Sequence, residues 1–227
     1  MEYSAMLKIL QSYAEKDFAE FQKRLIHTDR EILGVRTPTL RKIAKEYKGD
    51  IDKLFSYPNE YYEIVFIKLT VASRLPYPEF IKRLKDCVKL IDNWALCDSF
   101  KYKNVSARRE DFLSVLEELF LSGKEFYQRY VLVSLLFYYV DTPYLPILKK
   151  YILCANTQYY YVYMAVAWLI AEVIIKHYEE GLRLLDTVKQ DVKTHNKAIQ
   201  KAVESFRLTN EQKKNLCSLK IKQPNKR

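Results

Sequence analysis

Glycine and proline are scarce in this chain. Only 4 of its 227 residues are glycine and 7 are proline. Sheet-rich folds depend on glycine-bearing turns, and phosphate-binding loops need several glycines in a short motif, so both are disfavoured. The uncharged, tyrosine-rich segment over residues 157–171 is shorter than the roughly 18 to 20 residues of a membrane span. We therefore expect a buried helix there and no membrane association.

Metal-ligating and disulfide-forming patterns are also missing. The 4 cysteines have no C-x-x-C spacing, and the 3 histidines are dispersed. The N-terminus, MEYSAMLKIL, has no basic region followed by an apolar run, so no secretion signal is visible. In an unsecreted chain the cysteines are expected to be reduced thiols, and a cytoplasmic location follows by default.

Positive charge is in excess, with 38 Lys and Arg against 28 Asp and Glu, a net charge of +10. Residues 212–227 carry six cations and no acid, which a solvated tail would explain. Two internal clusters remain, one over residues 36–48 and one flanking residues 92–98. They are either solvated helix faces or a surface that contacts phosphates.

Apolar residues recur at three- and four-residue spacing along nearly the whole chain, which predicts an all-helical fold. Thr37-Pro38 and Thr142-Pro143 each look like an N-cap followed by proline at the first helical position. The segment around Arg129 aligns with that around Met164, 35 residues on, and then with that around Lys197, after 33 more. Such periods indicate stacked antiparallel helix pairs, an α-solenoid with a concave face, although a generic helical bundle is not excluded.

Four residues are candidates for chemistry, although none is sufficient alone. Trp94 and Asp98 are four apart, so they share one face of a helix. Trp168 and Arg129 lie in successive repeats. On composition alone, a tryptophan on an apolar helix is usually core, and a lone Asp is usually a cap or a surface residue.

The order and spacing of these residues resemble the AlkD-like DNA alkylation repair family, DNA glycosylases built from HEAT-like helical repeats. The matching blocks extend from Gly34 to about Arg207. They are Gly34-Val35-Arg36-Thr37-Pro38 with Arg41, then residues 94–99, Arg129 with its apolar helix, residues 165–168, and residues 196–205. The sequence departs from the family at Asn93, where some relatives carry a second tryptophan, and at Ala171 and Glu172, where a basic residue can occur.

The resemblance implies a curved α-solenoid of HEAT-like antiparallel helix pairs, expected as one domain over residues 1–219 with a basic tail at 220–227. It implies Asp98 as the catalytic carboxylate, Arg129 beside it, and Trp94 and Trp168 lining a DNA-facing cleft. We expect the phosphate contacts to come from basic residues on the same face, namely Arg36, Arg41, Lys103, Lys193, Lys197 and Lys201.

The implied activity is the removal of N3- and N7-alkylated purines from duplex DNA by a monomer. It needs no metal or organic cofactor and no deep base-flipping pocket. A non-catalytic protein of the same fold that binds branched or distorted DNA is the alternative, and a protein-binding helical scaffold is a third. A steep salt dependence of DNA binding would separate the first two from the third.

Overall fold

The structure is a computed structural model that describes residues 2–222. Within this range every regular element is helical and no strand occurs, apart from an isolated bridge between Glu31 and Tyr61. The all-helical prediction is therefore confirmed. No helix in the described part of the chain is long and apolar enough to cross a membrane. The four cysteines, all within the described range, form no disulfide.

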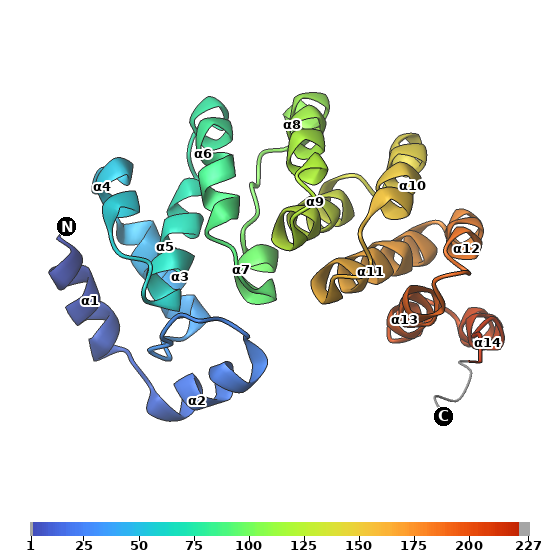
Figure 1. Cartoon of the computed structure of the whole chain (residues 1–227), viewed down its shortest axis with the longest axis horizontal. Helices are drawn as coiled ribbons and strands as arrows, with labels where there is room; N and C mark the ends of the chain where they lie inside the picture. The colour runs from blue at the N-terminus through green and yellow to red at the C-terminus, as the bar shows by residue number, and fades with distance from the viewer. Residues whose placement is uncertain (1, 223–227) are drawn as a thin grey trace. The chain divides into compact units, whose positions relative to one another are not determined.

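The chain folds into two compact units, with the boundary between Arg108 and Arg109. The expectation of a single domain over residues 1–219 stays a prediction. The N-terminal unit contains seven α-helices and a closing 3-10 turn (Figure 1). They are α1 (Tyr3–Ser12), α2 (Lys16–Leu25), α3 (Thr37–Glu46), α4 (Ile51–Ser56), α5 (Tyr62–Ala72), α6 (Tyr77–Lys89), α7 (Trp94–Ser99) and η1 (Ser106–Arg108).

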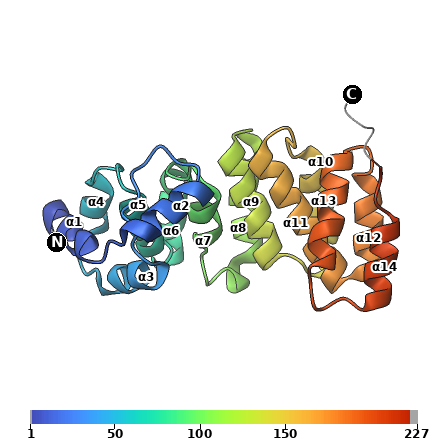
Figure 2. The same ribbon diagram turned by 90° about the horizontal axis from the view of Figure 1, so that it is seen from below.

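The C-terminal unit is built from successive helix pairs. Its elements are α8 (Arg109–Leu121), α9 (Glu125–Tyr138), η2 (Thr142–Tyr144), α10 (Leu145–Cys154), α11 (Tyr160–Lys176), α12 (Tyr178–Thr187), α13 (Val192–Val203) and α14 (Asn210–Ser218). The second helices of three pairs, α9, α11 and α13, lie side by side, with α11 packed against both others (Figure 2). These are the three segments that the sequence repeat aligns, so the repeat correctly locates equivalent helices.

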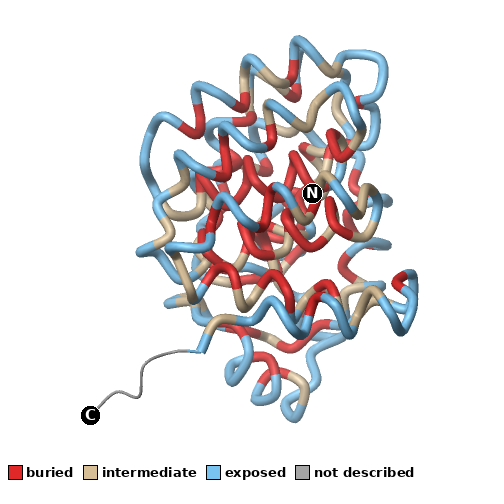
Figure 3. Tube along the Cα trace, turned by 90° about the vertical axis from the view of Figure 1, so that its right-hand side faces the viewer, coloured by how far each residue is buried: buried red, intermediate tan, exposed pale blue. Residues whose placement is uncertain are grey.

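The two most apolar helices are the central ones of their units. In α11 ten residues are buried, and in α5 nine are, and these are distributed around each helix rather than along one stripe. A helix that is apolar on all sides is stable only when neighbours cover it. The buried helix expected at residues 157–171 is thus found as α11, beginning at Tyr160. Figure 3 shows the buried residues gathered in the interior, with exposed residues on the outer turns of helices and in loops.

Two predicted helix starts are shifted by one residue. Thr37 and Thr142 are the first residues inside α3 and η2, and the N-caps are Arg36 and Asp141. Backbone N–H groups in the first turn of a helix have no intrahelical partner. Proline, which has no backbone N–H, is therefore tolerated at the second helical position as well as at the first.

The basic tail expected at 220–227 lies mostly outside the described residues, which end at Lys222. The part that is described is bound to α13. The Asn196 side chain donates to the Ile221 carbonyl at 2.7 Å and accepts from the Ile221 N–H at 2.9 Å. This paired contact fixes the chain beyond α14 against the body of the C-terminal unit.

Candidate functional site

Helix α7 carries two of the four candidate residues, and polar side chains fix its start. It has six residues, too few to be stable alone, so its surroundings must hold it in place. Asn93, fully buried, caps it by accepting from the Leu96 N–H at 3.0 Å. The Asn93 amide in turn donates to Asp92 at 2.7 Å. Asp92 also accepts from Thr28 at 2.6 Å and pairs with Arg30 at 2.5 Å. Asn93, the departure from the family pattern, is therefore a structural cap.

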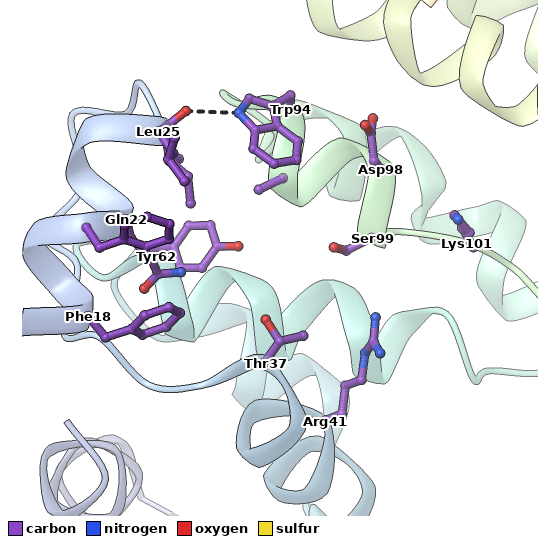
Figure 4. A pocket seen from close by; sticks show the side chains of 13 residues that line it. Phe18, Gln22, Leu25, Thr37, Arg41, Tyr62, Trp94, Asp98, Ser99 and Lys101 are labelled. Atoms are coloured by element: carbon purple, nitrogen blue, oxygen red, sulfur yellow. Dashed lines mark hydrogen bonds between the residues drawn. The ribbon is translucent and has the colours of Figure 1, made fainter. Parts of the chain in front are cut away.

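Trp94 is held at the edge of a cavity by its indole N–H. This group donates to the Leu25 carbonyl at 3.0 Å, at the C-terminal end of α2 (Figure 4). The last carbonyls of a helix have no intrahelical partner, so this bond satisfies one of them. With its N–H fixed, the side chain still leaves 38% of its surface exposed. Trp94 thus presents aromatic surface to solvent rather than filling the core.

Asp98 lines the same cavity, which has a volume of about 330 Å³ and lies within the N-terminal unit. One wall is apolar and comes mainly from α2. It is formed by Phe18, Phe21, Leu25 and Ile26. The opposite side is polar and includes Arg41 of α3 and Lys101, just after α7 (Figure 4). The structure therefore brings Trp94, Asp98 and Arg41 to one cavity.

The charges around this cavity affect one another. Burial lowers the pKa of the Lys101 ammonium, and the nearby Arg41 lowers it further, whereas the Asp98 carboxylate opposes the shift. Two cationic side chains and one carboxylate therefore share the cavity.

The position of α3 depends on a buried carboxylate in α5. Glu63, with no exposed surface, accepts the backbone N–H groups of Leu33, Gly34 and Val35 at 2.9 to 3.3 Å. Burial raises the pKa of the Glu63 carboxyl, and the three N–H bonds act against the shift. Gly34 has φ of +84°, and a Cβ there would lie 2.3 Å from the Glu15 carbonyl oxygen. Only glycine fits at this turn, which leads directly into the helix that carries Arg41.

Arg36, predicted to contact DNA, lies beside the cavity but is paired. It forms an ion pair with Glu15 at 2.7 Å, and its guanidinium lies 4.0 Å from the centre of the Phe18 ring. The hydrogen bond from Arg36 lowers the pKa of Glu15. Lys103, another predicted contact, is exposed in the turn after α7 and is not part of the cavity lining.

Arg129 and Trp168 belong to the C-terminal unit. Arg129 is 6% exposed and donates to the Tyr161 carbonyl at 2.9 Å, in the first turn of α11. Trp168 is half-buried and meets Phe137 edge to face, with ring centres 5.8 Å apart. Tyr161 and Trp168 are seven positions apart on this helix, a rise of about 10 Å. Trp168 is itself part of α11 and lies two turns from the point on that helix that Arg129 contacts. The convergence of all four candidates stays a prediction.

The three predicted lysines of α13 share one helix face at four-residue spacing. Lys193 lies 3.7 Å from the centre of the Tyr163 ring, Lys197 bonds to Gln200 at 3.0 Å, and Lys201 pairs with Glu204 at 2.9 Å. The sequence left open whether His195 contacts the DNA backbone or lies on a solvated face, and the structure supports neither. It is buried, and its ring nitrogens face the carbonyls of Leu185 and Leu219 at 3.2 and 3.0 Å.

Glu63 and Asn93, which hold α3 and α7 in place, were not predicted from the sequence, and neither was Gln22 of the cavity lining. Their partners or neighbours are mostly distant in the chain, so no local pattern marks them. Asn93 is the exception, because asparagine three residues before Leu96 is a common N-cap pattern. Among residues 2–222, no group of three His, Cys, Asp or Glu side chains is placed to hold a metal ion.

The fold and the cavity define a class: an all-helical protein of stacked helix pairs, with a carboxylate and an exposed tryptophan in a cavity that cations also line. The chain matches the model of the family described as DNA alkylation repair enzyme over residues 6–206. It belongs to that family, and all four candidate residues lie within the match. Comparison with curated proteins and with solved structures gives no match.

Proposed function

We propose that this protein is a monofunctional DNA glycosylase that removes cationic N3- and N7-alkylated purines from duplex DNA. The observation that carries the proposal is the pairing of Asp98 with Trp94 on one short, polar-capped helix, at an open cavity, in a chain of the DNA alkylation repair family. Neither a metal nor an organic cofactor has a role in it.

The chemistry requires a fixed negative charge and little else. Alkylation at N3 or N7 gives the purine a positive charge, so the base leaves without being protonated. When the bond from C1′ to the base nitrogen breaks, its electron pair goes to the base, which becomes neutral. Positive charge then develops on the sugar, where a carboxylate stabilises it. Water adds to C1′ and gives its proton to Asp98 or to solvent.

Trp94 and Trp168 supply aromatic surface that attracts the cationic nucleotide, each contact contributing about 0.5 to 2 kcal/mol. Arg129 positions Asp98 or binds a phosphate. Phosphates along the duplex are bound by basic residues of both units, which hold the DNA in register but do not read its sequence. The residues proposed for this role are Arg36, Arg41, Lys103, Lys193, Lys197 and Lys201.

The test is the release of N7-methylguanine and N3-methyladenine from methylated duplex DNA, measured chromatographically. The intact protein should release both, and Asp98→Asn should release neither at a comparable rate. Asp186→Asn is the matched control, because Asp186 is exposed on α12 and pairs only loosely with Lys189, at 3.5 Å. DNA binding without any base release would refute the glycosylase and favour a non-catalytic protein for distorted DNA.

A further inference from the structure

Helix α11, which lies between α9 and α13 in the C-terminal unit (Figure 2), is open to solvent along one narrow stripe. Within residues 160–172, all of which the structure describes, the residues that are not buried are Tyr160, Tyr161, Met164, Trp168 and Glu172. Tyr160, Met164 and Trp168 recur at every fourth position, so they share one face of the helix. Tyr160 therefore opens to the same side as Trp168, about 12 Å away along the helix.

Four aromatic rings meet at the N-terminal end of α11 and form what we call the aromatic patch: Phe126, Tyr160, Tyr161 and Tyr163. The Tyr160 ring meets the rings of Tyr161 and Tyr163 edge to face, with ring centres 5.1 and 5.4 Å apart. The Phe126 ring of α9 lies 5.1 Å from that of Tyr161. Edge-to-face contacts stabilise the rings in these positions. Tyr160 still leaves 56% of its surface exposed, so its neighbours hold an aromatic ring at the surface instead of burying it.

Cationic groups lie against the aromatic patch. The Lys193 ammonium of α13 is 3.7 Å from the centre of the Tyr163 ring, and the Arg129 guanidinium of α9 is 5.7 Å from that of Tyr161. Glu125, an acid beside them, accepts the backbone N–H of Tyr161 at 2.9 Å. Positive charge therefore accompanies the exposed rings, as expected of a surface for an anionic partner.

This combination fits a single-stranded nucleic acid. Proteins bind such strands by stacking bases on aromatic side chains and by placing cations along the phosphates. In an intact duplex each base is already stacked between its neighbours, so a surface tyrosine finds no free base face. An unpaired strand offers one at every nucleotide. The contact does not depend on sequence, because every base has a π-face.

We propose that the aromatic patch binds an unpaired DNA strand that continues from the duplex, with Tyr160 stacking on one of its bases and Lys193 contacting a phosphate. The proposal rests on the glycosylase function proposed above, which places DNA on this face of the C-terminal unit. It adds a second ligand, single-stranded DNA. The strand bound here is undamaged, and the alkylated purine takes no part in the contact. The protein should therefore favour duplexes that end in a single-stranded extension or contain a gap.

The direct test compares a blunt duplex with the same duplex extended on one strand by about ten thymidines, by fluorescence anisotropy with the full-length protein. The intact protein should bind the extended duplex more tightly. Tyr160→Ser should weaken binding of the extended duplex about fivefold or more, the value of one base stacked on one ring, and leave the blunt duplex nearly unchanged. Tyr160→Phe, which keeps the ring, should bind both as the intact protein does. Tyr13→Ser, at an exposed tyrosine after α1, is the matched control and should also bind both normally.

Three results would overturn the proposal. One is equal affinity of the intact protein for the two duplexes. Another is an equal loss for both in Tyr160→Ser, because the ring would then contact the paired backbone. The third is a loss in Tyr160→Phe as large as in Tyr160→Ser, because the hydroxyl and not the ring would then be the contact.

Base release separates this inference from the proposed function. Tyr160→Ser should release N7-methylguanine from a blunt methylated duplex at the rate of the intact protein. Normal release by the intact protein without any preference for the extended duplex would overturn this inference alone. Absence of release by the intact protein, with the extended duplex still preferred through Tyr160, would overturn the glycosylase function alone.

Discussion

Replacement of Asn93 by alanine should lower both stability and activity, because Asn93 joins α7 to the rest of the N-terminal unit. The change removes the cap from Leu96 and the donor to Asp92. Loss of an N-cap typically costs about 1 kcal/mol. Because Leu96 is fully buried, its N–H is then without water as well as without its acceptor, which costs about 1 to 3 kcal/mol more. The free energy of unfolding should therefore fall by about 2 to 4 kcal/mol.

The size of the effect can be measured in two ways. For a chain of this length, each kcal/mol corresponds to about 2 to 4 °C in Tm, so a fall of about 4 to 16 °C is expected. Asn93→Ser keeps an acceptor for the Leu96 N–H and loses only the bond to Asp92, which still has Thr28 and Arg30 as partners, so it should recover most of the loss. Asn104→Ala, at an exposed asparagine in the turn after α7, is the control and should melt as the intact protein does.

Activity should follow the position of α7 rather than global folding. Measured well below the Tm of every variant, single-turnover release of N7-methylguanine should be slowed by Asn93→Ala more than DNA affinity is weakened. Asn93→Ser should restore most of the rate. If Asn93→Ala melts and reacts as the intact protein does, the reasoning that this residue positions Trp94 and Asp98 is refuted.

Two further predictions concern buried and exposed lysines. Burial lowers the pKa of Lys68 to about 8, so the folded protein loses this proton at a lower pH than the unfolded chain does. Burying the charged Lys68 ammonium lowers the free energy of unfolding. This loss is complete below about pH 8 and is relieved as the pH rises towards the ordinary lysine pKa of 10.5. Urea unfolding should show that the free energy of unfolding rises between pH 8 and pH 10 more in the intact protein than in Lys68→Met. Parallel pH profiles of the two proteins would contradict the lowered pKa of Lys68. Lys193→Ala, Lys197→Ala and Lys201→Ala should each weaken DNA binding and reduce the slope of log affinity against log salt by about 1, measured by fluorescence anisotropy; an unchanged slope would remove that lysine from the interface.

Periodic and short-range features of this protein could be predicted from its sequence. Repeats of 35 and 33 residues locate α9, α11 and α13, because each helix pair buries the same apolar positions against its neighbours. The four-residue spacing of Trp94 and Asp98 correctly places both on one helix, and the structure adds that they line one cavity.

Pairings between distant residues could not be predicted. Glu63 is bound to backbone groups about 30 residues earlier in the chain, and Trp94 to a carbonyl 69 residues earlier. His195 looked like part of a basic helix end, since its neighbours Lys193 and Lys197 are cationic. It is buried because its side chain points to the opposite side of α13, towards Leu185 and Leu219. A single sequence carries no signal for such pairings.

The most direct test of the proposed chemistry is the single-turnover excision rate on a duplex with one N7-methylguanine, measured alongside DNA affinity. Removing one preorganised electrostatic group typically slows catalysis about 100-fold to 1,000-fold. Asp98→Asn should therefore lose at least about 100-fold in rate while its dissociation constant for the duplex stays close to that of the intact protein. A rate for Asp98→Asn equal to that of Asp186→Asn and the intact protein would contradict the assignment of Asp98 as the catalytic carboxylate.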